Sequence, residues 1–195
     1  MTDILTTWRT ELRAAAPPWP VRPFLIVKHG YMSPWFVPWA WFSRSGAFNV
    51  LCFVIVSEDL LNCPAPVRRA IAAHEAGHWA RFHGFIWLSA MFLVMHRDPG
   101  WVATPVVVLA QQFGVLAGLA AFVLALALCV WLLLQLQRHF EHAADDYCAA
   151  QVGYPCAVAA LQWLHHRLVL EPRRKPSKWI LERIRRMETK SICAR

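Results

Sequence analysis

Two histidines and a glutamate stand at a spacing that could hold and use a metal ion, in the segment "AAHEAGH" at residues 72–78. On an α-helix, positions i and i+4 share a face, so His74 and His78 can direct ring nitrogens at the same ion. Glu75 lies one position round the helix, where it could accept a proton from metal-bound water. Because a catalytic zinc site usually has three protein ligands, the pattern predicts a zinc site that needs one more residue.

The nearest further histidine does not complete a longer motif. The pattern HExxHxxGxxH would need glycine at 81 and histidine at 84, whereas the chain has Arg81 and Gly84. His83 falls nine residues after His74, roughly 180° away around a helix of 3.6 residues per turn. It could become a ligand only if the helix broke, so we predict a structural place for His83 at the helix end.

A second group of chemically capable residues follows in "LQLQRHFEHAADDYCAA", residues 134–150. If this segment is helical, Glu141 and Asp145 form an i, i+4 pair on one face. Glu141 would complete a set of two histidines and one carboxylate, and Asp145 would orient a ligand histidine. The pattern alone leaves other arrangements open: His139, His142 or Asp146 could bind the metal, or Glu141 could pair with Arg138.

An uncharged apolar run separates the two groups. Val102–Leu134 contains no charged residue, and only Gln111 and Gln112 interrupt its apolar character. Since about 20 apolar residues cross a bilayer as a helix, this run predicts a membrane-spanning segment. The shorter run Phe85–Met95 and a Pro-Gly turn signal within His96–Trp101 predict a helical hairpin. Two crossings are also what the chemistry requires, because both groups must meet on one side of the membrane.

The distribution of basic residues favours a membrane rather than a nucleic acid as partner. The net charge is +8, but of the 20 Lys and Arg only Arg97 lies in the predicted hairpin loop. The others flank the apolar region, so the positive-inside rule places both flanks, and the site, in the cytoplasm. The basic stretch "EPRRKPSKWILERIRRMETK" could rest on anionic lipid headgroups or form a solvated helix.

The remaining segments predict a small β element beside the helices. Residues 1–46 form an N-terminal segment, with an amphipathic piece and a Trp- and Pro-rich loop that lies at the membrane interface or forms a small aromatic core. The second domain, 47–195, has a strand at Ala47–Val56, a helix at Val67–His83 and the membrane hairpin at about 85–137. The six cysteines form no CxxC, which indicates buried or idle thiols rather than zinc ligands.

The combination of the two groups resembles the HtpX and CAAX prenyl endopeptidase family of membrane zinc metallopeptidases. The resemblance covers much of residues 47–171: an apolar strand with "SEDLL", the helix with "AAHEAGH", membrane helices, and "RHFEHAADDYCAAQVGYPCAVAALQWL". Glu141, Ala144 and Asp145 match the Glu-x-x-Ala-Asp motif of that family. Lys175 departs from it, because many relatives carry a histidine there, and the gap to Arg183-Ile184 is longer.

The resemblance implies zinc on His74, His78 and Glu141, with Glu75 as general base. The expected fold is mainly α with a small β element: an integral membrane metallopeptidase whose two zinc-ligand helices are joined by a helical hairpin. Its substrates would be membrane or membrane-associated proteins, and the small chain favours a bacterial inner membrane with the site on the cytoplasmic side. The sequence makes no prediction of the oligomeric state.

Three other functions are alternatives. A sensor-type protease would cleave a cytoplasmic regulator at the same kind of site. An inactive membrane scaffold would keep a vestigial zinc site, but Glu75 argues against it, because a structural site needs no base. A site-2 type intramembrane protease is disfavoured, because three arginines flank the motif. The candidates for stabilising an oxyanion are His142, Tyr147 and Arg138.

Overall fold

The computed structural model describes residues 2–18, 23–28, 47–50, 53–86, 89, 100–170 and 178–193. They belong to two compact units. The first comprises Met1–Phe85 and Glu141–Arg195, and the second comprises Ile86–Phe140. One long helix, α7 (Val115–Val152), contributes residues to both units. The boundary near residue 46 stays a prediction, and the Trp-rich loop with Trp35, Trp39 and Trp41 lies outside the described residues.

The first unit contains a three-stranded sheet in the order β1-β3-β2. Strand β1 (Phe24–Lys28) runs parallel to β3 (Phe53–Ser57), and β2 (Ala47–Val50) runs antiparallel to β3. The single strand predicted over Ala47–Val56 is therefore wrong, because the chain reverses direction between Val50 and Phe53. No Gly, Pro, Asn or Asp stands at residues 51–52 to mark that reversal. Strand β1 was also missed, since its residues were taken for part of the aromatic loop.

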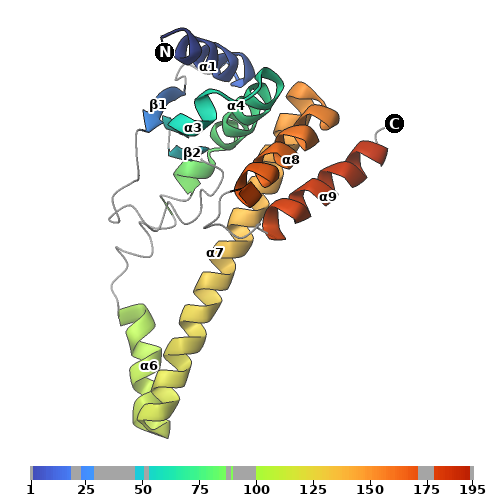
Figure 1. The fold of residues 1–195 in the computed structure, drawn as a ribbon. Coiled ribbons are helices and arrows are strands. Elements are labelled where there is room, and N and C mark those ends of the chain that lie inside the picture. Colours follow the sequence, from blue (N-terminus) through green and yellow to red (C-terminus); the bar gives the residue numbers. More distant parts are fainter. Residues whose placement is uncertain are drawn as a thin grey trace. The chain divides into compact units, whose positions relative to one another are not determined.

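Helices make up most of the rest of the first unit: besides the end of α7, Figure 1 shows five further labelled helices. They are α1 (Thr2–Ala15), α3 (Glu58–Leu61), α4 (Ala65–Ala80), α8 (Tyr154–Leu170) and α9 (Lys178–Cys193). Two prolines open α4, as the sequence predicted, because a proline needs no amide partner in the first turn. The helix ends three residues before the predicted His83.

The core of the first unit holds α4 from several sides. Trp8 of α1 is buried and donates its indole N–H to the carbonyl of Leu61 at 3.4 Å. Small side chains of α4, such as Ala73 and Ala76, are fully buried and let neighbouring elements come close. Apolar residues of β3, α8 and α9 complete the same cluster. The helix that carries the histidines is thus fixed by packing along its length.

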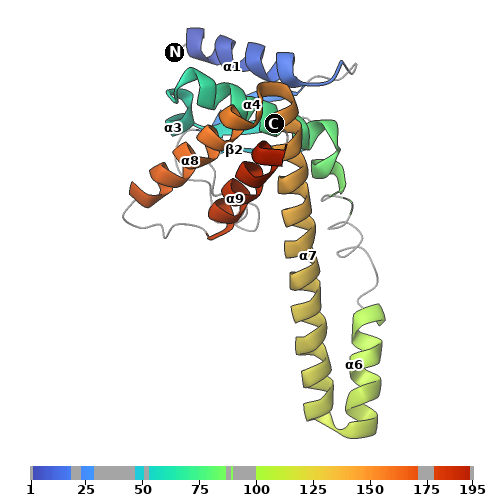
Figure 2. The ribbon, with the colours of Figure 1, turned by 90° about the vertical axis from the view of Figure 1, so that its right-hand side faces the viewer.

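The second unit is a helical hairpin, as Figure 2 shows. Helix α6 (Gly100–Phe113) ends at Gly114, whose φ of 91° is in the left-handed region, and α7 starts at the next residue. A Cβ on Gly118 would lie 2.6 Å from the Cβ of Ala110, so the two helices touch where Gly118 has no side chain. The uninterrupted helix predicted over Val102–Leu134 is therefore wrong, because the chain turns back at Gly114. Residues 96–99 of the predicted turn lie outside the described residues, and α6 starts at Gly100.

The apolar part of α7 is long enough to cross a membrane and is largely exposed. From Val115 to Leu136 it carries no charge, and at 1.5 Å per residue this stretch is about 33 Å long. Many of its large apolar side chains are exposed; Leu116, for example, is 82% exposed. Among the described residues, α7 is the one helix that is long and apolar enough to cross a membrane, by length and composition. An exposed apolar surface of this extent needs an apolar partner.

Gly77 of α4 packs closely against α7. A Cβ at this position would lie 3.0 Å from the Cβ of Tyr147 and 3.1 Å from the Cα of Ala144. Gly77→Ala should lower the free energy of unfolding by about 1–2 kcal/mol, because overpacking against backbone outweighs the roughly 1 kcal/mol that alanine gains in helix propensity. Chemical denaturation of the detergent-solubilised protein measures this. A stability equal to or above wild type would show that the helices can move apart freely.

Candidate metal centre

The metal-ligand residues of the two sequence motifs meet inside the first unit. His74 and His78 come from α4, and Glu141 comes from α7. Their ligand atoms lie within 4.8 Å of one another, and they form the one such group of three found in the described part of the chain. Sequence reasoning reached these three residues, and the structure brings them together.

The distances within this group fit a tetrahedral metal. The Nε2 atoms of His74 and His78 are 3.1 Å apart, and each lies 3.5 Å from a carboxylate oxygen of Glu141. Ligand atoms bound about 2.1 Å from a tetrahedral zinc ion are about 3.4 Å from one another. The histidine rings meet nearly at right angles, at 85°, so both can present a nitrogen edge to the same point. Two imidazoles and a carboxylate are the donor set of one class of catalytic zinc site.

Glu75 lies in α4 between the two histidines and is buried. Burial raises the pKa of its carboxyl group, and the nearby histidines act in the opposite direction. A carboxylate with a raised pKa binds a transferred proton more readily than an exposed one. Its position and its environment are both those of a proton acceptor at the metal site.

A buried network of ion pairs contacts two of the three metal-ligand residues. The Nδ1 of His74 lies 3.0 Å from Asp145, which is one helical turn after Glu141 in α7. Arg183 of α9 donates to both carboxylate oxygens of Asp145, at 2.8 and 2.6 Å. It also lies 2.7 Å from Glu141. Asp145 can therefore fix the ring of His74 while Arg183 fixes both carboxylates.

The charges of this network set the protonation of its members. Burial alone would raise the pKa of Glu141, but Arg183 and the two histidines hold it well below its usual value. Burial would also lower the pKa of His74, but Asp145 and Glu141 raise it to about 9. Glu141 is thus an anion ready to bind a cation. A metal that binds His74 competes with a proton for the ring nitrogen.

Arg183 contacts two carboxylates of the site, whereas the motif analysis noted it only as part of the Arg183-Ile184 pair of the family pattern and gave it no role. It had a signal in the sequence: Ile180, Ile184 and Met187 form a buried stripe of α9, and Arg183 lies in that stripe. A charged residue in an apolar helical stripe indicates a buried partner, because an unpaired buried charge is costly. Lys175, the departure from the family pattern, lies outside the described residues.

Removing Arg183 should destabilise the protein strongly. Arg183→Ala removes the cation that pairs with both Asp145 and Glu141 and leaves the two buried carboxylates with only the histidines as partners, which we expect to cost about 3–5 kcal/mol of unfolding free energy. The matched control is Arg186→Ala, in the same helix. Arg186 pairs with the partly exposed Asp146, so its loss should cost less than about 1 kcal/mol. Urea unfolding of both variants in detergent, with zinc chelated, compares them. Equal costs would show that the buried network contributes no special stability.

The structure places most of the alternative residues elsewhere. Asp146, a rival ligand, pairs with Arg186 and with Lys190, and the Nζ of Lys190 lies 2.8 Å away. His142 stacks on the ring of Trp179. The hydroxyl of Tyr147, a candidate for stabilising an oxyanion, donates to the carbonyl of Ala15 at 2.7 Å. Arg138 and His139 belong to the second unit.

The structure also changes the place of His83. Helix α4 breaks after Ala80, and Phe82 has a φ of 55°. His83 is buried, and its Nδ1 lies 2.9 Å from the Nδ1 of His78, on the side of that ring away from Glu141. The sequence gave no reason to expect this break in the helix. The break places His83 behind a metal-facing histidine.

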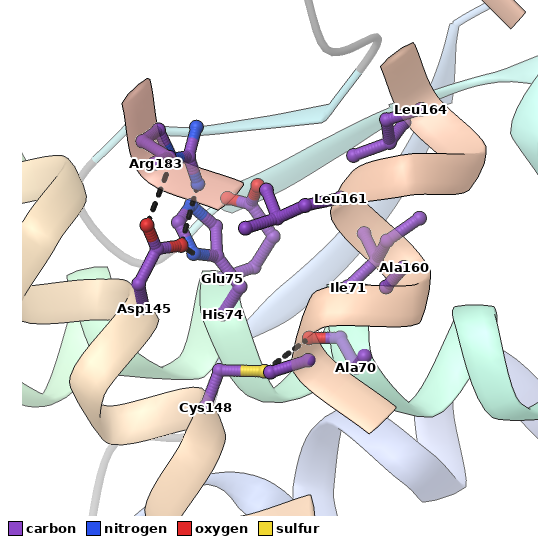
Figure 3. Close-up of a pocket in the computed structure, with 11 residues that line it drawn as sticks. Ala70, Ile71, His74, Glu75, Asp145, Cys148, Ala160, Leu161, Leu164 and Arg183 are labelled. Atoms are coloured by element: carbon purple, nitrogen blue, oxygen red, sulfur yellow. Dashed lines mark hydrogen bonds and ion pairs between the residues drawn. The ribbon is translucent and has the colours of Figure 1, made fainter. Parts of the chain in front are cut away.

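A pocket lies against the network and is shown in Figure 3. Polar groups occupy one side, where Arg183, Asp145 and His74 contact one another. Apolar residues of α8, such as Leu161 and Leu164, form another side. Cys148 lines it too and donates its thiol to the carbonyl of Ala70 at 3.2 Å. Burial raises the pKa of that thiol to about 12, so it stays protonated and is no thiolate ligand.

The comparisons with known proteins agree with this geometry. A family model described as peptidase family M48 matches residues 41–180, well over half of the chain. That range contains both groups of ligand residues and ends three residues before Arg183. Neither the curated proteins nor the solved structures include a match.

Proposed function

Because the chain belongs to peptidase family M48, a family of zinc metallopeptidases, we propose that it is a membrane-anchored zinc metalloendopeptidase. The observation that carries the proposal is the convergence of His74, His78 and Glu141 at the separations of a tetrahedral site, with Glu75 buried beside them. A scaffold with a structural metal would have no use for the carboxylate of Glu75.

His74 and His78 would hold zinc through Nε2, and Glu141 through its carboxylate. When bound, zinc lowers the pKa of water towards about 7 and polarises a carbonyl group. Glu75 would accept the proton of the attacking water on its carboxylate and pass it to the amine nitrogen that leaves. Asp145 would keep the proton of His74 on Nδ1, so that the Nε2 lone pair stays directed at the ion.

The substrate would bind as an extended strand beside β2. This strand lies at an edge of the sheet, and it contacts α4, the helix that carries the two histidines. Main-chain hydrogen bonds to an edge strand bind a peptide without regard to its side chains. The edge of β2 therefore supports an endopeptidase that acts inside unfolded segments rather than at one defined residue.

The membrane anchor would be the hairpin of α6 and α7. The exposed apolar stretch Val115–Leu136 matches a bilayer core of about 30 Å. Charged residues resume at Arg138, two residues after this stretch, where the chain would leave the apolar core of the membrane. Basic flanks favour the cytoplasmic side of the membrane. Membrane or membrane-associated proteins would then be the natural substrates.

Metal removal tests the proposal. Full-length protein purified from membranes in detergent should contain one zinc per chain and cleave an unfolded protein substrate. A strong chelator should abolish cleavage, and added Zn²⁺ should restore it whereas Mg²⁺ should not, because nitrogen ligands select zinc over magnesium. The readouts are metal analysis and the appearance of new peptide ends. Cleavage that survives complete removal of zinc, or purified protein that takes up no zinc, would refute the proposal.

A further inference from the structure

Among the described residues, His83 is the histidine whose ring lies behind that of His78, a metal-facing histidine. Its Nδ1 is 2.9 Å from the Nδ1 of His78, and the two rings meet at 73° with their centroids 5.1 Å apart. The rings therefore do not stack, and the two nitrogens meet at the ring edges, where the N–H and the lone pair of an imidazole lie. The other nitrogen of His78, Nε2, faces His74 and Glu141.

Only one arrangement of protons lets His78 bind a metal through Nε2. A neutral imidazole has one N–H donor and one lone pair. If the lone pair is on Nε2, the proton is on Nδ1, and that N–H needs an acceptor. The atom in front of it is the Nδ1 of His83, which can accept only if His83 carries its own proton on Nε2.

The backbone conformation between the two histidines also favours a specific contact between His83 and His78. To bring His83 back onto His78, α4 must end and the chain must turn sharply. It does so with Phe82 at a φ of 55°, among the described residues the one non-glycine with a positive φ. A bulky aromatic residue rarely adopts that conformation, and such strain collects at functional sites.

We propose that His83 is a positioning residue of the metal site: its Nδ1 accepts the Nδ1–H of His78 and so directs the Nε2 lone pair of His78 at the metal. His74 receives the same support from a carboxylate, Asp145. The site would therefore use two different acceptors, an anion behind one histidine and a neutral imidazole behind the other. The inference rests on the proposed function, because it concerns the same zinc site.

The test measures zinc affinity by competition with a chromophoric chelator on the full chain in detergent. His83→Leu should weaken zinc binding about 10- to 100-fold, the usual loss when a partner behind a ligand histidine is removed. His83→Asn should stay within about threefold of wild type, because its amide oxygen can accept the same N–H. His166→Leu removes an exposed histidine of α8 and should change nothing. The visible spectrum of the Co²⁺-loaded protein should change in His83→Leu and not in His83→Asn.

A second pair of variants tests the backbone. Phe82→Gly keeps the positive φ at no steric cost, so zinc affinity should match wild type. Phe82→Pro fixes φ near −65°, so it should weaken zinc binding as His83→Leu does. This pair of variants tests the role of His83 even if His83→Leu fails to fold.

The outcomes separate the two proposals. Wild-type zinc affinity in His83→Leu or Phe82→Pro would overturn the role of His83 and leave the zinc site intact. Equal losses in His83→Leu and His83→Asn would overturn it as well, because they would point to packing rather than to the hydrogen bond. A wild-type protein that binds no zinc would instead overturn the proposed function.

Discussion

Glu75→Gln should leave zinc bound and abolish proteolysis. The glutamine has nearly the same shape, and Glu75 is not among the three ligand residues, so one zinc per chain should remain. The amide cannot accept the proton of the attacking water, and removing a general base typically lowers the rate by about 10²- to 10⁴-fold. The measurements are metal analysis and the initial rate of cleavage of an unfolded protein substrate.

The same variant separates a peptidase from a scaffold. In cells, a peptidase predicts that Glu75→Gln accumulates uncleaved membrane proteins, which quantitative proteomics would reveal as a defined set. A scaffold predicts that wild type and variant are indistinguishable, because both keep the fold and the metal. Arg69→Gln, an exposed change in the same helix, serves as control and should behave as wild type. Full activity of Glu75→Gln would remove Glu75 from the mechanism.

The sequence predicted the parts of the site in which both residues belong to the same helix. His74 and His78 share a face because they are four residues apart, and the same spacing relates Glu141 to Asp145. Local periodicity fixes each pair independently of the rest of the fold. That the two pairs meet in space depends on tertiary structure. It was predicted from the resemblance to a family and from the need for a third ligand.

The break at Gly114 could not be predicted, because glycine is common within membrane helices. Gly114 and Gly118 stand four residues apart in the same apolar run, yet only Gly114 turns the chain. Gly118 instead lies inside α7 and allows α6 to come close. The difference comes from tertiary contact, which composition and periodicity do not record. The predicted hairpin joined Phe85–Met95 to the whole run Val102–Leu134, whereas the observed hairpin divides that run into two helices.

The position of His83 was hidden for a related reason. Glycine is the usual residue where a helix ends with a positive φ, and Gly84 rather than Phe82 would have been the natural choice. The chain instead places the positive φ on Phe82, which costs backbone energy that the buried contacts of His83 must offset. A strained residue of this kind is visible only in the structure.

Glu141→Gln should remove most of the zinc affinity. Structural zinc sites with four ligands bind with about 10–16 kcal/mol, so one ligand accounts for roughly 3–4 kcal/mol, or about 10²- to 10³-fold in affinity. The charge matters as well as the contact, because Arg183 lies 2.7 Å from Glu141 and would be only partly balanced by Asp145 once that carboxylate is lost. Chelator competition measures the change.

The control for Glu141→Gln is Asp146→Asn, which neutralises an acidic residue further along the same helix. Asp146 is tied to Arg186 and Lys190 of α9, so its loss should leave zinc affinity within about twofold of wild type. If instead Asp146→Asn lost zinc and Glu141→Gln kept it, the ligand set would be wrong. Because the two carboxylates lie on different sides of α7, the pair of variants tests which face of the helix meets the two imidazoles of α4. The metal site depends on that contact between α4 and α7, because each helix supplies ligand atoms that the other lacks.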